Sequence, residues 1–111
     1  MKAISIRQPY VEQILVGTKT REYRSRVCHV RGRVLVHSST RVDSEHFDAV
    51  VAAGLLCGGL LGSVEVVGCE PDGNGGYAWL LANPVRFVDP VPFKGKVGWF
   101  EVPDEVLAEL R

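Results

Sequence analysis

The sequence predicts an α+β domain built around a small β-barrel, with short helices near its beginning, middle and end. About six or seven segments show the alternating or densely aliphatic patterns of β-strands, separated by turns rich in glycine and proline. Helical spacing of apolar residues is confined to a few short segments. The chain has 111 residues, 46% of them apolar, and shows no linker or repeat. We therefore expect a single domain over residues 1–111.

The first 24 residues predict a strand, a helix and a second extended segment joined by a tight turn. Residues 3–7 alternate apolar and polar side chains, as expected of a half-buried strand. Pro9 suits the first position of a helix, and apolar residues within 11–15 recur at helical spacing. Gly17 suits the end of that helix because glycine adopts positive φ without strain. The chain should then reverse into an extended segment over residues 18–24.

This second extended segment concentrates charge immediately after the turn. Lys19, Glu22 and Arg24 follow Gly17 within a stretch of eight residues. Glu22 and Arg24 would share one face of a strand, and the long stem of Lys19 would let its amine reach the same side. Clustered charges of this kind favour a functional site. The alternative is a partly buried ion-pair network that fixes the turn.

The remaining segments predict one further helix in the middle of the chain and one at its end. The middle helix should begin with Asp43 as its cap, with Phe47, Val50 and Val51 facing inwards. The strand before it ends in polar residues from His37 onwards, at a strand end where binding sites are often built. The expected strands cover residues 33–38, 60–67, 77–81, 86–91 and 97–102, with possible bulges at glycines 58, 59, 62 and 68.

The charge of the chain is balanced overall but unevenly distributed. Residues 1–41 contain nine lysines and arginines and two acidic residues, a net charge of +7, and the remaining residues carry −7. Such asymmetry predicts a basic face that meets phosphates. The alternative is that folding interleaves the two halves and leaves an ordinary solvated surface.

The cysteines give no indication of a metal or disulfide framework. Cys28, Cys57 and Cys69 are odd in number and form no Cys-x-x-Cys pair. We expect buried or incidental thiols, Cys57 being placed in the core, and no metal or other cofactor. The sequence also lacks a run of transmembrane length and the pattern of a signal peptide, so the expected location is the cytoplasm, without a membrane partner.

The charged segment and its surroundings resemble the ASCH domain family, the activating-signal-cointegrator homology domains related to PUA domains. The family pattern Gly-x-Lys-x-x-Glu-x-Arg corresponds to Gly17, Lys19, Glu22 and Arg24. The blocks at residues 5–10, 31–39, 77–79 and 92–95 also resemble family strands and helices, so the resemblance covers nearly the whole chain. It implies a PUA-like pseudobarrel with short helices packed beside it.

The first functional interpretation is a module that binds RNA or a nucleotide-type ligand. Basic side chains would neutralise phosphate, a tyrosine would stack on a base, and Glu22 would accept from exocyclic amines. The resemblance favours this interpretation, because ASCH domains are similar to PUA domains, which bind RNA. The residues expected at the ligand are Arg7, Tyr10, Lys19, Glu22, Arg24, Arg26, Arg31, Arg33, His37 and Ser38.

The second interpretation, also implied by the resemblance, is an enzyme. Some small ASCH proteins deacetylate N4-acetylcytidine with a lysine, a threonine three residues later and a distant glutamate, and ribonuclease activity is associated with others. Lys19 matches the lysine, whereas Glu22 stands at the threonine position. If the chain is an enzyme, Lys19 and Glu22 are therefore its expected catalytic residues. The third interpretation is a purely structural ion-pair network.

Overall fold

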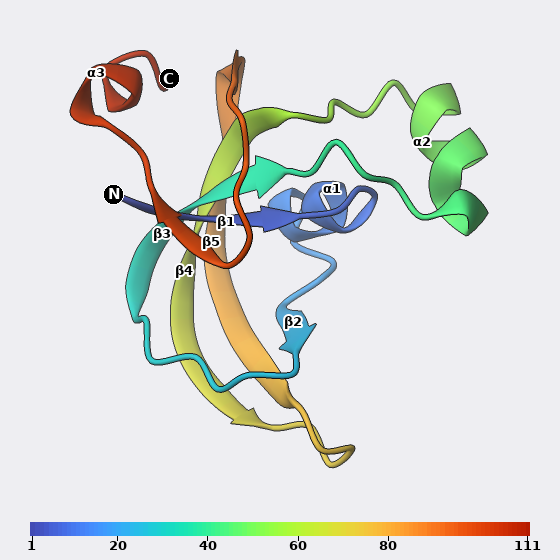
Figure 1. Ribbon diagram of the computed structural model, residues 1–111, viewed down its shortest axis with the longest axis vertical. Coiled ribbons are helices and arrows are strands. Elements are labelled where there is room, and N and C mark those ends of the chain that lie inside the picture. Colours follow the sequence, from blue (N-terminus) through green and yellow to red (C-terminus); the bar gives the residue numbers. More distant parts are fainter.

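Figure 1 shows the computed structural model, which describes residues 1–111 as one curled, six-stranded sheet with short helices outside it. The strands are β1 (Lys2–Ile6), β2 (Arg21–Arg24), β3 (Gly32–Ser38), β4 (Gly59–Pro71), β5 (Tyr77–Pro92) and β6 (Trp99–Glu101). The helices are α1 (Tyr10–Leu15), α2 (Phe47–Ala52), preceded by a 3-10 turn over Ser44–His46, and α3 (Asp104–Leu107). The predicted α+β barrel-like fold is confirmed. None of the helices is both long and apolar enough to span a membrane.

The sheet has the order β2-β5-β4-β3-β1-β6, and its one parallel pair is β1 with β3. In this pair Ser5 lies opposite His37, and Ile6 lies opposite Ser38. The carboxyl ends of parallel strands meet at the same edge of a sheet. The polar residues that end β1 and β3 are therefore brought to one place, although more than 30 residues separate them in the sequence.

The two faces of β1 and β3 serve different apolar clusters, because successive side chains of a strand point to opposite faces. Ile4, Ile6, Val34 and Val36 belong to a cluster of 13 buried residues that includes the inner face of α1. On the other face, a smaller cluster includes Ala3, Leu35 and Phe100 and is packed by side chains of α3. Ser5 and His37 follow Ala3 and Leu35 in the alternation. They therefore lie on the second face, beside the smaller cluster.

The long hairpin of β4 and β5 departs from the prediction in two respects. Strand β4 continues to Pro71, past the expected end at residue 67. Residues 77–81 and 86–91 were expected as two strands, whereas the structure joins them in the single strand β5. Asn83 takes a positive φ of 52°, and the pairing with β4 continues on both sides of it, at Ala82 and Val85. A bend that keeps its cross-strand hydrogen bonds does not end a strand. The expected irregularities at Gly62 and Gly68 are confirmed by register shifts at both positions.

The middle helix also differs from the expectation. It is a 3-10 turn followed by the six-residue α2, and only Val50 of the expected inner stripe is buried. Phe47 and Val51 are 55% and 63% exposed. Helix α2 stands away from the sheet in Figure 1, so it has too little covering structure to bury a full stripe. Cys57, expected in the core, is exposed for the same reason, because it lies in the segment that returns from α2.

Close packing of α1 on the sheet depends on Gly62. A Cβ at this position would clash with the carbonyl oxygen of Val85 and would lie 2.6 Å from a methyl group of Leu15. We expect Gly62→Ala to lower the free energy of unfolding by about 1–3 kcal/mol, since backbone and core would both have to shift. Chemical denaturation would measure the loss. The control is Val67→Ala on the same strand, whose side chain is exposed, with an expected change within about 0.5 kcal/mol. Equal effects of the two changes would contradict the packing argument.

Candidate functional site

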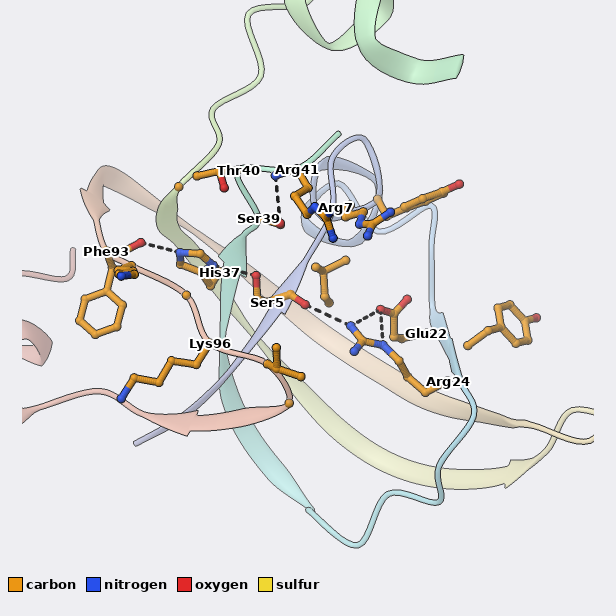
Figure 2. Close-up of a pocket in the computed structure, with 18 residues that line it drawn as sticks. Ser5, Arg7, Glu22, Arg24, His37, Ser39, Thr40, Arg41, Phe93 and Lys96 are labelled. Atoms are coloured by element: carbon orange, nitrogen blue, oxygen red, sulfur yellow. Dashed lines mark hydrogen bonds and ion pairs between the residues drawn. The ribbon is translucent and has the colours of Figure 1, made fainter. Parts of the chain in front are cut away.

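An open pocket of about 900 Å³ lies at the edge of the sheet where β1 and β3 end (Figure 2). Besides Gly58, which precedes β4, four parts of the chain line it. These are the end of β1 with the start of α1, the strand β2, the end of β3 with the residues that follow it, and residues 93–98 between β5 and β6, called here the 93–98 loop. The parallel pairing of β1 and β3 thus positions the two central walls of the pocket.

One wall holds a carboxylate between two cations. The Glu22 side chain lies 3.4 Å from the Lys19 amine through Oε1, and Oε2 accepts hydrogen bonds from Nε and Nη2 of Arg24 at 3.1 and 2.9 Å. Nη2 of Arg24 also donates to the backbone carbonyl of Ser5, at 3.1 Å. Glu22 is buried, so its charge requires this compensation. The network ties β2, an edge strand, to β1 across the pocket.

The lysine of this network is enclosed by aromatic rings. The Lys19 amine lies 5.4 Å from the ring centroid of Tyr10 and 5.4 Å from that of Tyr23, within the range of cation–π attraction. Tyr10 is half-buried, and its hydroxyl lies 3.2 Å from Nε2 of His46, whereas Tyr23 is largely exposed. Both rings line the pocket. Lys19 therefore holds two aromatic surfaces next to the cavity.

The second wall contains a buried histidine with a defined hydrogen-bond pattern. His37 is 2% exposed; its Nε2 lies 2.6 Å from the carbonyl oxygen of Phe93, and its Nδ1 lies 3.0 Å from Oγ of Ser5. A carbonyl only accepts, so Nε2 carries the proton, and in the neutral ring Nδ1 accepts from the Ser5 hydroxyl. Burial lowers the pKa of His37, an effect partly offset by its bond to Phe93. The neutral ring is thus the form that the site favours.

The rim of the pocket is basic, and part of its charge is unpaired. Arg7 forms an ion pair with Asp43, and Arg24 is paired with Glu22. In contrast, Arg41, Lys94 and Lys96 line the same pocket and form no ion pair. No group of three or more His, Cys, Asp or Glu side chains converges as a metal site would require. The unpaired charge among the residues that line the pocket is therefore positive.

Comparison with known proteins gives a family. The sequence profile of the ASCH domain matches residues 4–89, which is most of the chain. The chain belongs to the ASCH domain family. The match includes β1, α1 and the charged segment that contains Lys19, Glu22 and Arg24. It also includes the end of β3 that supplies His37, but it stops before the 93–98 loop.

Solved structures agree with this membership. The fold is similar to that of ASCH from Zymomonas mobilis, with a TM-score of 0.68 at 12% sequence identity, over 99% of this chain and 95% of that chain. Two mutant proteins of the same ASCH protein, a serine-to-alanine and a tyrosine-to-phenylalanine change, match with TM-scores of 0.68 and 0.69 at 11% identity. They cover 99% of this chain and 96% and 98% of theirs. This ASCH chain therefore has the α+β, PUA-like fold, and no curated protein matches it.

The structure brings together part of the residue set expected from the sequence. Arg7, Tyr10, Glu22, Arg24 and His37 line the pocket of this ASCH domain. Lys19 does not line the pocket itself, but its amine contacts the Glu22 side chain, which does. Its reach to the Glu22 side of the strand is as the sequence predicted.

The other expected residues lie elsewhere. Ser38 is fully buried and exchanges hydrogen bonds with the backbone of Gly59. Arg31 donates to the backbone carbonyls of Cys28 and Val30, and Arg33 bonds Ser63, Glu65 and Asn83. Arg31 and Arg33 line a separate, shallower hollow that shares no residue with the pocket, and Arg26 lines neither.

Several pocket residues were not anticipated. The sequence pattern predicts only a strand position for Ser5 and predicts no site role for Arg41, Lys94 and Lys96. Their positions depend on how segments distant in the sequence meet. The sequence contains one signal for the loop: two lysines flank a glycine at residues 94–96, and glycine permits the backbone to approach a ligand closely.

The burial of His37 predicts a dependence of stability on pH. Because burial lowers the pKa of His37 below its ordinary value of 6.5, the unfolded chain binds more protons around that pH. This contribution to the free energy of unfolding is complete above about pH 6.5 and should be lost as the pH falls through the lower folded-state pKa. Urea denaturation between pH 7.5 and 5 would measure it. His37→Gln, which keeps a donor and an acceptor, should reduce the slope; an unchanged slope would contradict the assignment.

Proposed function

We propose that this ASCH domain binds a nucleotide-type ligand, and single-stranded RNA in particular, in the pocket at the ends of β1 and β3. The observation that carries the proposal is the unpaired positive charge of Arg41, Lys94 and Lys96, all three of which line the pocket. Surface cations usually find acidic partners or face open solvent. Three that share a cavity without a carboxylate partner favour an anionic ligand such as a phosphate.

The backbone of the 93–98 loop supports the same ligand chemistry. The N–H groups of residues 94–98 have no hydrogen-bond partner within the chain. Gly95 and Gly98 have no side chains that would cover the backbone of this segment, and Gly98 takes a positive φ of 73°. A short run of free backbone N–H groups beside lysines is an arrangement that phosphate-binding loops use. We assign the phosphate of the ligand to this side of the pocket.

The opposite side suits a base. Tyr10 and Tyr23 offer aromatic surfaces, and exposed tyrosine rings stack on unpaired bases in single-stranded nucleic acid. Glu22 provides carboxylate oxygens, which accept from the exocyclic amine of cytosine or adenine. Lys19 and Arg24 hold that carboxylate in place. The pocket volume of about 900 Å³ is sufficient for a nucleotide.

A longer RNA would extend the contact surface. The hollow lined by Lys2, Arg31 and Arg33 carries further cations, although Lys2 is paired with Glu101 and Arg33 with Glu65. We propose Arg26, Arg31 and Arg33 as contacts for a polymer only and not for a mononucleotide. A cytoplasmic location, which three unpaired cysteines favour, belongs to the same proposal.

Calorimetric titration would test the ligand class. We expect cytidine 5′-monophosphate to bind more tightly than cytidine, since only the former carries the phosphate for Arg41, Lys94 and Lys96. A short oligocytidylate should bind with a salt dependence that Lys96→Gln reduces by about 0.7 in the slope of log K against log salt. Arg31→Gln is the matched control for the mononucleotide and should leave its affinity unchanged. Equal binding of nucleotide and nucleoside would argue against a phosphate subsite.

Removal of Lys19 separates function from structure. We expect Lys19→Ala to weaken nucleotide binding by about tenfold or more. The change removes the cation beside Oε1 of Glu22 and the amine that contacts the rings of Tyr10 and Tyr23. The melting temperature should change little, since Arg24 still compensates the Glu22 charge. Thermal unfolding with and without the nucleotide would measure both quantities. A large loss of melting temperature with unchanged affinity would instead support a purely structural ion-pair network.

Hydrolysis is the second candidate function. The observation that favours it is a buried carboxylate, Glu22, 3.4 Å from the amine of Lys19 at the wall of the pocket. Such a pair would act on N4-acetylcytidine by base-assisted attack of water, or on RNA by base-assisted attack of a ribose hydroxyl. Both oxygens of Glu22 are already engaged by cations, which makes this use of the carboxylate the weaker candidate. Proton NMR of N4-acetylcytidine with the protein would detect the methyl signal of released acetate.

A further inference from the structure

The pocket contains a hydroxyl and an imidazole in direct contact. Oγ of Ser5 lies 3.0 Å from Nδ1 of His37, and Nε2 of His37 is fixed by the carbonyl oxygen of Phe93 at 2.6 Å. Figure 2 shows Ser5 between His37 on one side and Arg24 on the other. A hydroxyl, a ring nitrogen that accepts its hydrogen bond and a third group that orients the ring are the parts of an activated nucleophile.

We propose that Ser5 is a nucleophile activated by His37 and that the pocket is an acyl-transfer site. The substrate class is a short acyl ester or amide carried on an anionic, nucleotide-type molecule. The carrier rests on the proposed function of the pocket, whereas the reactivity of Ser5 does not. Neither Lys19 nor Glu22 is the nucleophile in this scheme.

The register of β1 and β3 holds the two reacting groups together. Ser5 and His37 are opposite each other in the parallel pair, so their side chains leave the sheet on the same face. The rings of Phe93 and Phe100 approach the imidazole edge-on, with centroids 6.5 and 5.8 Å away. This packing leaves Ser5, which is only half-buried and lines the pocket, as the route by which His37 acts on a ligand.

The surroundings of His37 keep it in the form a base requires. Burial lowers its pKa, so the ring is neutral near pH 7. The neighbouring elements contribute cations: Arg24, which donates to the Ser5 carbonyl, and the two lysines of the 93–98 loop. The nearby carboxylate of Glu22 is paired with Lys19 and Arg24. No carboxylate is hydrogen-bonded to the ring, whose partners are Ser5 and Phe93. Nδ1 is therefore available to accept the Ser5 proton.

The 93–98 loop supplies groups for the charge that develops on the substrate. Gly95 lies directly against the pair, since a Cβ there would be 2.5 Å from Cε1 of His37 and 3.2 Å from Oγ of Ser5. The backbone of Gly95 is thus next to the nucleophile, and its N–H, which has no partner within the chain, is the group we assign as an oxyanion donor. Only glycine permits this approach, which accounts for the residue at position 95.

The reaction is a two-step acyl transfer. Oγ of Ser5 attacks the acyl carbon while its proton moves to Nδ1 of His37, and the bond from the acyl carbon to the leaving oxygen or nitrogen breaks as that atom takes the proton from Nδ1. Water then attacks the acyl-serine and gives a proton to Nδ1, which returns it to Oγ. The products are a carboxylic acid and the free alcohol or amine, and Ser5 is regenerated.

An alkyl fluorophosphonate tests the nucleophile independently of nucleotide binding. This probe loses fluoride as Oγ forms a bond to phosphorus, and intact-mass and peptide mass spectrometry locate the adduct. We expect one adduct, on Ser5, which disappears in Ser5→Ala. His37→Gln, which keeps a donor and an acceptor, should slow labelling by about 100-fold, as expected for loss of a general base. Ser44→Ala removes an exposed serine outside the pocket and should label like the wild type.

The pH profile distinguishes a base from a structural partner. Labelling should reach a plateau above pH 6.5 and decline with a midpoint below it, and this decline should be absent from the residual rate of His37→Gln. Acetate release from N4-acetylcytidine 5′-monophosphate should require Ser5. Binding of cytidine 5′-monophosphate with no adduct on Ser5 would overturn the nucleophile and leave the binding pocket intact. An adduct on Ser5 without nucleotide binding would support the nucleophile and refute the nucleotide ligand.

Discussion

The parallel pairing of β1 with β3 is the constraint on which the site depends. Both strands reach the same edge of the sheet, so the residues that end them, and the segments that leave them, surround one pocket. The register is set by burial, because Ile4 and Ile6 pack with Val34 and Val36 in the larger apolar cluster. A shift by one residue would move these side chains out of the core. The same packing therefore places Ser5 opposite His37, and the geometry of the site is held by the packing of the core.

The Glu22 network links the packing of β2 to the wall of the pocket. Strand β2 is at the edge of the sheet and pairs only with β5. Its link to β1 is the side chain of Arg24, which donates to Glu22 and to the Ser5 carbonyl. A buried carboxylate is costly unless it is paired, so Arg24, which bonds both Glu22 and β1, is required for the strand to lie there. Once placed, the network forms a rigid wall with two tyrosine rings, which favours ligand binding at low entropic cost.

The sequence predicts the parts of this molecule that depend on neighbouring residues. Strand alternation, the turn at Gly17 and the spacing of Lys19, Glu22 and Arg24 are local patterns, and the structure bears them out in β1, α1 and β2. The contact of Ser5 with His37 depends on the register of two strands, which no local pattern contains. The merging of two expected strands into β5 depends on hydrogen bonds with β4 that continue past Asn83. The exposure of Phe47 depends on the absence of any element that covers α2.

The charge asymmetry shows why net charge locates a binding surface poorly. The first 41 residues carry +7, yet several of their cations are engaged within the fold: Arg7 by Asp43, Arg24 by Glu22 and Arg33 by Glu65. The unpaired cations of the pocket include Lys94 and Lys96, which come from the half that carries −7. An anionic ligand responds to the field that remains after internal pairing, in a cavity that excludes part of the solvent. The distribution of unpaired charge is a property of the fold, and it explains why the proposed anion subsite lies in the half of the sequence with negative net charge.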